Sequence, residues 1–431
     1  MPAVRALFIS FFYPPFNSIG GLRVSKMTRY LRDLGWDVRV VTAAEDDLPA
    51  DLGLEIPVGN VIRVDYLDVN ALPKRILGRG RVRSRGFETD KGSAVLGTLG
   101  RAYRDVVNFP DGQIGWFRPA LTAARALVEE WRPDVLVSSA LPATAHLVAN
   151  RLAKQYAIPW VAEYRDPWCM PGRRRRSWPL SLLERKLEDR VLRGASAIVT
   201  VSDAWAQMYR GRFRGVPVYT VPNGFDSSDL EQAKPPEGPP LRILYSGRVY
   251  ERQNPMLLLR AVRALVDGAP LVARTIRLEF VGRYLGSVRR AVSSLGLDSV
   301  VVVSEPLSHR AALAAQQAAH VLVLLLGMDD DVGWRPAKLY EYLGARRPIL
   351  VIGGTAQHEA WVVLRECRAG VAVDTVENAA AQLQAWALEL QRDGTIRSSV
   401  DEVCRARYER RSLAGELSDA LKATVQRQTR T

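Results

Sequence analysis

One short stretch of the sequence combines a cation and a carboxylate at the start of a predicted helix. It runs WRPAKLYEYLGARRPILVI from residue 334 to residue 352, and Pro336 is of a type favoured in a first helical turn. Lys338 places a positive charge where the unpaired N–H groups of a helix attract phosphate. Glu341 lies three residues later on the same face, placed to accept both hydroxyls of a ribose. The pair suits a nucleoside diphosphate, and it equally fits a plain Lys–Glu ion pair on a helix surface.

The elements that must hold this stretch belong to a repeating pattern of strands and helices. A strand pattern at 5–13 leads through a glycine-bearing loop at 17–21 into a helix pattern at 22–36 and a strand pattern at 37–43. This order predicts a parallel, doubly wound sheet. A polar, Pro-rich linker at 226–240 follows, and the same alternation then restarts. We therefore predict an α/β protein of two Rossmann-like domains, with ligands bound in a cleft between them near the carboxyl ends of the strands.

Composition narrows the classes of partner. The formal net charge is +14, and most of the excess lies in residues 1–228. A basic surface attracts polyanions. No zinc-finger, helix-turn-helix or RNA-binding motif accompanies the charge, so we expect phosphorylated ligands or anionic lipid and no nucleic acid. No apolar run has the length of a transmembrane helix, and no His/Cys/Asp cluster has metal-ligand spacing. The three cysteines are far apart and suit a reducing cytoplasm.

The motif around Lys338 carries a resemblance to a known family. The segment RPAKLYEYLGARRPILV resembles the donor-site helix of the GT-B glycosyltransferases of family 4, particularly the subgroup that builds bacterial surface polysaccharides. The resemblance spans nearly the whole chain, through the segments FFYPPFNSIGGLRVSKMTRYLRDLGWDVRVVT, AIPWVAEYRDPW, VTVSDAWAQMYRGRF, VPNGFD and LRILYSGR. It implies a GT-B fold, with an acceptor-side domain at 1–226 and a donor-binding domain at 227–411. In this fold class a last helix, here about 412–431, commonly crosses back to the first domain.

The resemblance also implies roles for residues of the second domain. Lys338 would neutralise the donor diphosphate, and Arg248, after the strand ILYSG, would be the second cation. Together they would stabilise the leaving nucleoside diphosphate without a metal. Glu341 matches the second glutamate of the family's acidic pair and would hold the ribose.

In the first domain the resemblance points to two glycines and a polar turn. Gly20 and Gly21 would let the backbone approach the donor closely, although a plain tight turn also explains them. Arg165 and Asp166 stand where many relatives place an active-site histidine and would line the sugar and acceptor side; a structural turn with a salt bridge is the alternative. His146, early on a helix, is a further candidate for the cleft, against ordinary helix packing.

The sequence departs from the family pattern at two places. Gly333 stands where the first glutamate of the acidic pair would fall, and Asp330 or Asp331 just upstream is a candidate substitute that would contact the sugar. The family's second cation motif, EKG, is replaced by YERQNP, which contains Arg252 and Gln253.

A basic, aromatic-bearing segment suggests a membrane surface as partner. Residues 171–194 read PGRRRRSWPLSLLERKLEDRVLRG, in which Trp178 and several leucines group on one side of a helix behind clustered arginines. Together with the Arg-rich loop at 73–94, such a segment would lie on an anionic membrane and suit a lipid-linked acceptor. Leu183 and its neighbours along the helix, Leu187 and Val191, are equally compatible with ordinary core.

These observations lead to one preferred function and two alternatives. We expect a cytoplasmic enzyme, peripheral on the inner membrane face, that transfers a hexosyl or N-acetylhexosaminyl group from a nucleotide-diphosphate sugar to a polysaccharide or lipid-linked glycan precursor. The resemblance implies retention of anomeric configuration and no metal or other cofactor. A nucleotide-sugar 2-epimerase shares the architecture, but it needs several acid/base groups and the chain has 4 histidines. A non-catalytic sugar-nucleotide-binding subunit is motivated by Gly333, and a dehydrogenase is disfavoured because no G-x-G-x-x-G follows a strand.

Overall fold

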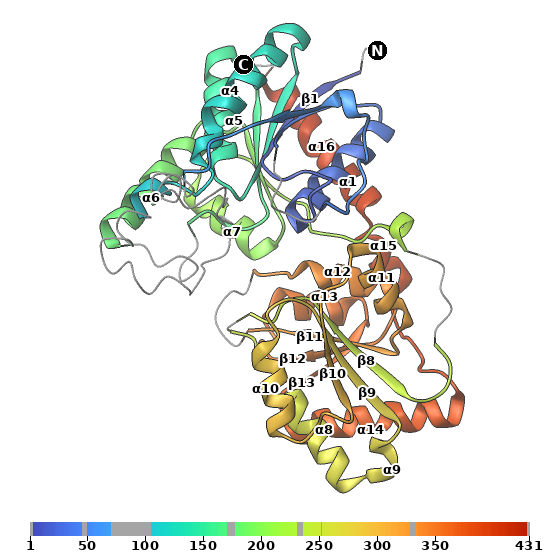
Figure 1. The fold of residues 1–431 in the computed structure, drawn as a ribbon. Coiled ribbons are helices and arrows are strands. Elements are labelled where there is room, and N and C mark those ends of the chain that lie inside the picture. The colour runs from blue at the N-terminus through green and yellow to red at the C-terminus, as the bar shows by residue number, and fades with distance from the viewer. Residues whose placement is uncertain are drawn as a thin grey trace. The chain divides into compact units, whose positions relative to one another are not determined.

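A computed structural model describes residues 3–44, 50–69, 105–169, 177–230, 236–250, 252–327 and 333–428. The chain divides into two compact units. The first consists of Met1–Pro222 with Leu413–Thr431, and the second of Asn223–Ser412. Figure 1 shows that each unit is a sheet covered by helices.

The sheet of the first unit has seven parallel strands in the order β3-β2-β1-β4-β5-β6-β7. The order reverses direction between β1 and β4, which is where a doubly wound sheet binds its ligands. The strands are β1 Arg5–Ser10, β2 Asp37–Ala43, β3 Val61–Val64, β4 Val135–Ala140, β5 Trp160–Tyr164, β6 Ala197–Thr200 and β7 Val218–Thr220. The helices are α1 Ile19–Asp33, α4 Phe117–Trp131, α5 Thr144–Tyr156, α6 Trp178–Leu192, α7 Asp203–Arg212 and α16 Arg410–Gln428.

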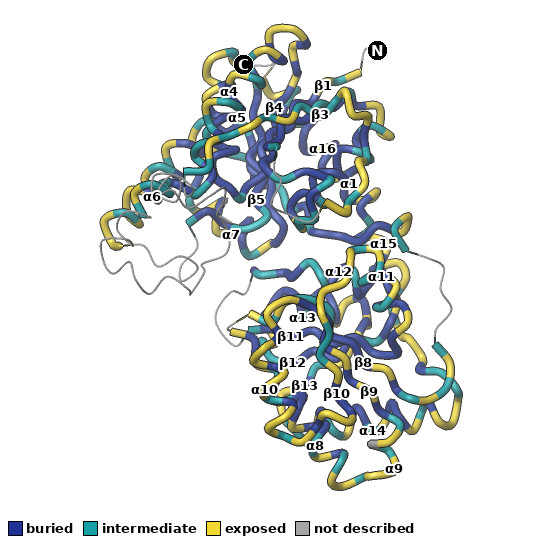
Figure 2. Tube along the Cα trace, viewed as in Figure 1, coloured by how far each residue is buried: buried dark blue, intermediate teal, exposed yellow. Residues whose placement is uncertain are grey.

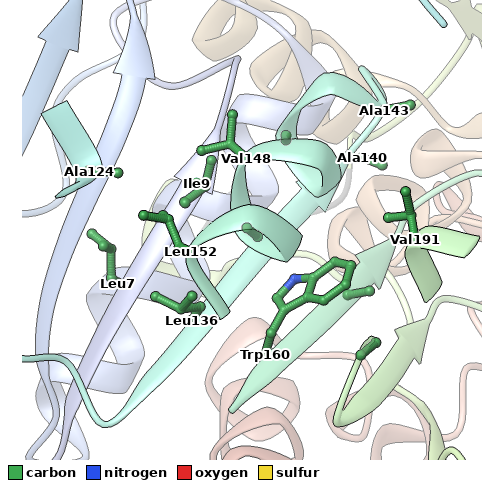
Figure 3. Packing of buried hydrophobic residues seen from close by; sticks show 14 of the residues in the cluster. Leu7, Ile9, Ala124, Leu136, Ala140, Ala143, Val148, Leu152, Trp160 and Val191 are labelled. Atoms are coloured by element: carbon green, nitrogen blue, oxygen red, sulfur yellow. The ribbon is translucent and has the colours of Figure 1, made fainter. Parts of the chain in front are cut away.

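Two apolar layers cover the faces of this sheet. On one face α4 and α5 pack against the strands, and Figure 3 shows Val148 and Leu152 of α5 beside Ile9 and Leu136 of the sheet. On the other face α1 packs together with α16. Trp36, just after α1, donates its indole N–H to Ser418 of α16 at 2.9 Å. The central strands β1, β4, β5 and β6 are covered on both sides and almost continuously buried, as parallel strands require, whereas the edge strand β3 is partly exposed.

The sheet of the second unit has six parallel strands in the order β10-β9-β8-β11-β12-β13. Its switch point lies between β8 and β11. The strands are β8 Leu241–Ser246, β9 Ile276–Val281, β10 Val301–Ser304, β11 Val321–Leu325, β12 Ile349–Ile352 and β13 Gly370–Val373. The helices are α8 Met256–Gly268, α9 Pro270–Ala273, α10 Gly286–Ser294, α11 His309–Ala318, α12 Ala337–Ala345, α13 Glu359–Glu366, α14 Val376–Asp393 and α15 Glu402–Ala406.

Helices again cover both faces of this sheet. One apolar cluster joins it to α8, α10 and α14, and another joins it to α12 and α13. Figure 2 shows buried residues along the strands and exposed ones on outer helix surfaces such as those of α9 and α10. The predicted pair of doubly wound α/β units is therefore confirmed.

Three expectations from the sequence meet different outcomes. The cysteines were expected to suit a reducing compartment, but Cys367 and Cys404, 37 residues apart, form a disulfide with a Cα–Cα distance of 5.1 Å. Within the described ranges, no helix is both long and apolar enough to cross a membrane. The Arg-rich loop predicted at 73–94 lies outside the described residues.

Candidate functional site

The two cations predicted to bind the donor meet at the switch point of the second unit. Lys338 lies in the first turn of α12, which follows β11, and Arg248 lies in the turn that follows β8. The Lys338 ammonium reaches the glycine before Arg248, because a Cβ on Gly247 would lie 3.0 Å from its Nζ. Gly247 has a φ of +122°, a conformation that favours glycine. The backbone therefore brings the two cations to the same turn.

A buried tyrosine hydroxyl fixes this arrangement. Lys338 Nζ donates to the hydroxyl of Tyr245 at 2.7 Å, and that hydroxyl donates to the carbonyl of Arg248 at 2.6 Å. Tyr245 lies in β8 and is completely buried. One side chain thus holds both the ammonium of Lys338 and the backbone of Arg248.

Gln253 ties the same loop to the sheet. Its amide oxygen accepts the backbone N–H of Tyr250 at 3.0 Å, and its amide nitrogen donates to the carbonyl of Leu325 at the end of β11, at 2.7 Å. Gln253 is buried. The residue at which this sequence departs from the family's EKG motif therefore joins the loops after β8 and β11.

Aromatic rings take the place of counter-ions around both cations. Lys338 Nζ lies 3.9 Å from the centroid of the Tyr245 ring. The Arg248 guanidinium carbon lies 5.4 Å from the Tyr250 centroid and 4.9 Å from the Tyr284 centroid. Among the described residues, neither cation forms an ion pair with a carboxylate. Their positive charge is thus left available to an anion.

Burial makes the charge of Lys338 sensitive to pH. Desolvation lowers the pKa of its ammonium to about 7, and the nearby Glu341 carboxylate opposes this only in part. An anion beside Nζ would favour the charged form and raise the pKa. In the free site near pH 7, Lys338 is therefore a mixture of the neutral amine and the ammonium. A bound anion shifts it to the ammonium.

Glu341 is held by the neighbouring helix. Its Oε2 accepts a hydrogen bond from the Nε2 of Gln316 in α11 at 3.0 Å. Lys338 donates to Tyr245 instead, so the plain Lys–Glu surface pair that the sequence also allowed is not formed among the described contacts. The cation and the carboxylate act as two separate groups on one helix.

In the first unit, Gly20 and Arg165 lie together. Ser18 caps α1, and its Oγ accepts the N–H of Gly21 at 3.0 Å. A Cβ on Gly20 would lie 1.5 Å from Nη1 of Arg165, so the guanidinium fills the space over this glycine. Arg165 also donates to the carbonyls of Ala140 and Leu141 at 3.1 and 2.6 Å. Its position depends on the turns after β4 and β5.

A buried ion pair also fixes the start of α1 against the sheet. Arg23 is fully buried and donates to Glu163 of β5 at 2.9 Å and to the carbonyls of Val221 and Pro222. Burial alone would raise the pKa of the Glu163 carboxyl, but the Arg23 charge and hydrogen bonds from Ser139 and Arg23 lower it. This ion pair stays charged and fixes the glycine turn against the sheet.

His146 lies in the first turn of α5 and is completely buried. Its Nδ1 is 2.7 Å from the hydroxyl of Ser138, which also accepts the indole N–H of Trp160 at 2.7 Å. The other ring nitrogen, Nε2, has no hydrogen-bond partner among the described residues. Burial, with the Arg165 charge, lowers the pKa of His146 to about 3. The ring is therefore neutral at physiological pH and a poor proton acceptor.

The remaining predicted residues differ in how far they can be placed. Asp166 follows Arg165 in the turn after β5 and is half-buried. Asp330 and Asp331 lie outside the described residues, and Gly333 directly precedes Trp334. Groups of three or more metal-ligating side chains are absent from the described ranges.

Sequence reasoning missed the residues that hold the predicted ones. These are the side chains beside Lys338, Arg248 and Glu341, namely Tyr245, Tyr250, Tyr284 and Gln316; the sequence marks Gln253 only as part of the segment that replaces the EKG motif. Only Tyr245 left a signal, as a polar aromatic residue in an aliphatic strand just before a glycine turn. The others lie in loops or on a different helix, and only the folded chain brings them to the site.

The comparisons with known proteins agree with this geometry. The family described as Glycosyl transferase 4-like domain matches residues 20–224. This part of the chain, a little under half of it, matches the model of that family. The resemblance to family 4 that the sequence suggested is thereby confirmed. A search of curated proteins found no match.

Solved structures of the same architecture extend over both units of this glycosyltransferase-like chain. Sucrose-phosphate synthase from Thermosynechococcus elongatus is 15% identical with a TM-score of 0.63, covering 98% of this chain and 100% of that one. WaaG, a glycosyltransferase involved in lipopolysaccharide biosynthesis, is 13% identical with a TM-score of 0.53, covering 96% and 99%. A putative UDP-N-acetylglucosamine 2-epimerase from Listeria monocytogenes is 11% identical with a TM-score of 0.56, covering 99% and 97%. The fold is therefore GT-B, and fold alone does not separate transferases from epimerases.

The pKa of Lys338 predicts a pH dependence of anion binding. Below about pH 7 the ammonium is charged, and above it the Lys338 amine must take up a proton from solvent when the anion binds. The affinity for inorganic pyrophosphate should therefore fall on the order of tenfold between about pH 7 and about pH 8.5, relative to Lys338→Arg, which stays charged. Calorimetric titration of both proteins measures this ratio, in which the titration of pyrophosphate itself cancels. Parallel pH curves for the two proteins would show that Lys338 does not titrate in this range.

Proposed function

We propose that the protein is a retaining glycosyltransferase that moves a sugar from a nucleotide-diphosphate donor to a polysaccharide or lipid-linked glycan precursor. One observation carries the proposal. The Lys338 ammonium lies against the turn that carries Arg248, at the switch point of the second unit, and no carboxylate among the described residues pairs with either cation. The transferase family match at residues 20–224 supports the same reaction class.

The donor diphosphate is the ligand that this arrangement suits. Lys338 lies in the first turn of α12, where backbone N–H groups add to the attraction for phosphate. As the bond to the sugar breaks, negative charge grows on the leaving diphosphate, and the two cations stabilise it. They supply the positive charge that a metal ion supplies in other enzymes, so we propose that no metal is needed.

The nucleoside would extend along α12 from the diphosphate. Glu341 lies three residues beyond Lys338, and its carboxylate oxygens can accept the two ribose hydroxyls. Gln316 holds one of these oxygens at 3.0 Å. This contact limits the rotation of the carboxylate and leaves its other oxygen for the ligand.

The first unit would supply the acceptor side. Arg165 is anchored by two carbonyls beyond β4 and covers Gly20 at the start of α1. Asp166 follows it in the same turn and is the candidate for contact with the sugar or the acceptor hydroxyl. His146 lies close enough to Arg165 for the guanidinium charge to lower its pKa, so it packs against the same region.

Transfer is preferred over epimerisation because of the state of the histidines. Burial lowers the pKa of His146 to about 3 and those of His320 and His358 to about 4. His320 accepts the backbone N–H of Arg242, and His358 caps α13. Three of the 4 histidines are thus neutral structural groups, whereas proton transfer at neutral pH needs a pKa near the working pH.

The donor assignment predicts large losses on removal of either cation. Lys338→Ala and Arg248→Ala should each lower turnover by about 100- to 1000-fold, because each removes a charge that stabilises the leaving group. Arg260→Ala, an exposed arginine of α8, is the matched control and should be neutral. The measurement is release of nucleoside diphosphate from UDP-, GDP-, dTDP- and ADP-sugars with a membrane extract as acceptor. Near-normal turnover in both variants, with folding intact, would remove the donor assignment.

We include an anionic membrane as partner because of the outer surface of α6. This helix buries the carboxylates Glu184 and Glu188 and exposes Trp178, Leu182 and Leu183, with Trp178 77% exposed. Its C-terminal half exposes the cations Arg185, Lys186, Arg190 and Arg193. Of the residues that the sequence left open, Val191 is core and Leu187 packs against core, while Leu183 is exposed. A lipid-linked acceptor would be reached from such a surface.

Vesicle binding tests this surface directly. Wild-type protein should float with vesicles that contain phosphatidylglycerol and not with pure phosphatidylcholine, and binding should weaken with salt. The double variant Trp178→Ser/Leu182→Ser and the charge reversal Lys186→Glu/Arg190→Glu should both lose binding. Leu388→Ser, an exposed leucine of α14, should not. Failure of the wild-type protein to bind anionic vesicles at low salt would exclude the membrane role.

A further inference from the structure

Arg248 is an exposed cation placed between two exposed aromatic rings. Its guanidinium carbon lies 4.9 Å from the Tyr284 centroid and 5.4 Å from the Tyr250 centroid. Tyr250 follows β8 and is itself backed by the edge of Trp334, at 6.1 Å between centroids. Tyr284 reaches the same guanidinium from the loop after β9. Two different loops at the carboxyl ends of neighbouring strands therefore converge on one side chain.

Tyr284 adopts a backbone conformation that a tyrosine rarely takes. Its φ is +60°, in the left-handed region that favours glycine. Its side chain is 53% exposed, so burial of apolar surface does not explain the choice of residue. A strained conformation held by a bulky, exposed side chain is characteristic of functional positions. What the ring does contact is the guanidinium of Arg248.

A ring face can hold a cation without neutralising it. A carboxylate partner would fix Arg248 but would compete with phosphate for the same N–H donors. An aromatic face attracts the guanidinium through its quadrupole and restrains a side chain with several rotatable bonds. The donors then remain available to a second ligand. Lys338 shows the same solution, because its ammonium lies over the Tyr245 ring.

We propose that Tyr284 is a positioning residue that holds the Arg248 guanidinium ready for the donor diphosphate. The inference rests on the donor site described under the proposed function. Tyr284 acts through Arg248. It holds the guanidinium in the free protein near the position that it takes when the diphosphate is bound. Less side-chain entropy is then lost on binding, which raises the affinity. The left-handed backbone is tolerated because it directs the ring onto the cation.

The proposal predicts opposite effects on stability and on binding. Tyr284→Gly removes the unfavourable φ and should leave the melting temperature unchanged or higher, yet weaken binding of inorganic pyrophosphate about fivefold, the scale of a cation–π contact. Tyr284→Phe keeps the ring and should bind within about twofold of wild type. Arg368→Gly relieves a similar φ of +49° at an exposed residue of the same unit, and it should leave binding unchanged.

Calorimetry and thermal melting of these variants, together with Arg248→Ala, decide the matter. In the Arg248→Ala background, Tyr284→Gly should have no further effect on pyrophosphate affinity, because the ring then has no cation to hold. Loss of affinity in Arg248→Ala with wild-type affinity in Tyr284→Gly would overturn this proposal and keep the donor site. Equal losses in Tyr284→Gly and Tyr284→Phe would also overturn it. Wild-type affinity in Arg248→Ala would instead contradict the donor site itself.

Discussion

The proposed chemistry depends on one constraint, which is that two positive charges are held at one turn without a carboxylate between them. Gly247 permits it, because a side chain at this position would meet the Lys338 ammonium at 3.0 Å. The Tyr245 hydroxyl maintains it by accepting from Lys338 and donating to the Arg248 carbonyl. Burying the Lys338 ammonium is unfavourable, and its lowered pKa reflects this desolvation. An anion beside Nζ would offset this desolvation cost by favouring the charged form of Lys338.

The doubly wound sheet explains why Arg248 and Lys338 lie at the same place although they are 90 positions apart in the chain. β8 and β11 are neighbours at the switch point of the second sheet, so the loops that follow them leave the sheet side by side. Arg248 comes from one loop, and Lys338 from the helix after the other. Gln253 links the two loops by bonding to Leu325 at the end of β11. The first unit also brings together residues from loops that follow different strands. Gly20 follows β1, and Arg165 follows β5 and donates to a carbonyl at the end of β4.

The features that the sequence predicted are those whose residues lie close together in the chain. Alternating strand and helix patterns revealed both doubly wound units, and Lys338, Glu341 and Arg248 stood out because they are charged residues beside apolar elements. Partners drawn from distant segments left no such mark. Gln316 of α11, which holds Glu341, reads as an ordinary helix residue, and the conformation of Tyr284 is invisible in sequence. The disulfide between Cys367 and Cys404 was missed for the same reason, since it depends on how α13 and α15 pack.

The most direct test of this account is the position of a nucleoside diphosphate in a crystal structure of the protein. The account predicts diphosphate oxygens within hydrogen-bonding distance, roughly 2.7–3.2 Å, of both Lys338 Nζ and the Arg248 guanidinium, with the ribose hydroxyls at Glu341. A diphosphate that touches neither cation, or that binds away from the turn after β8, would contradict it.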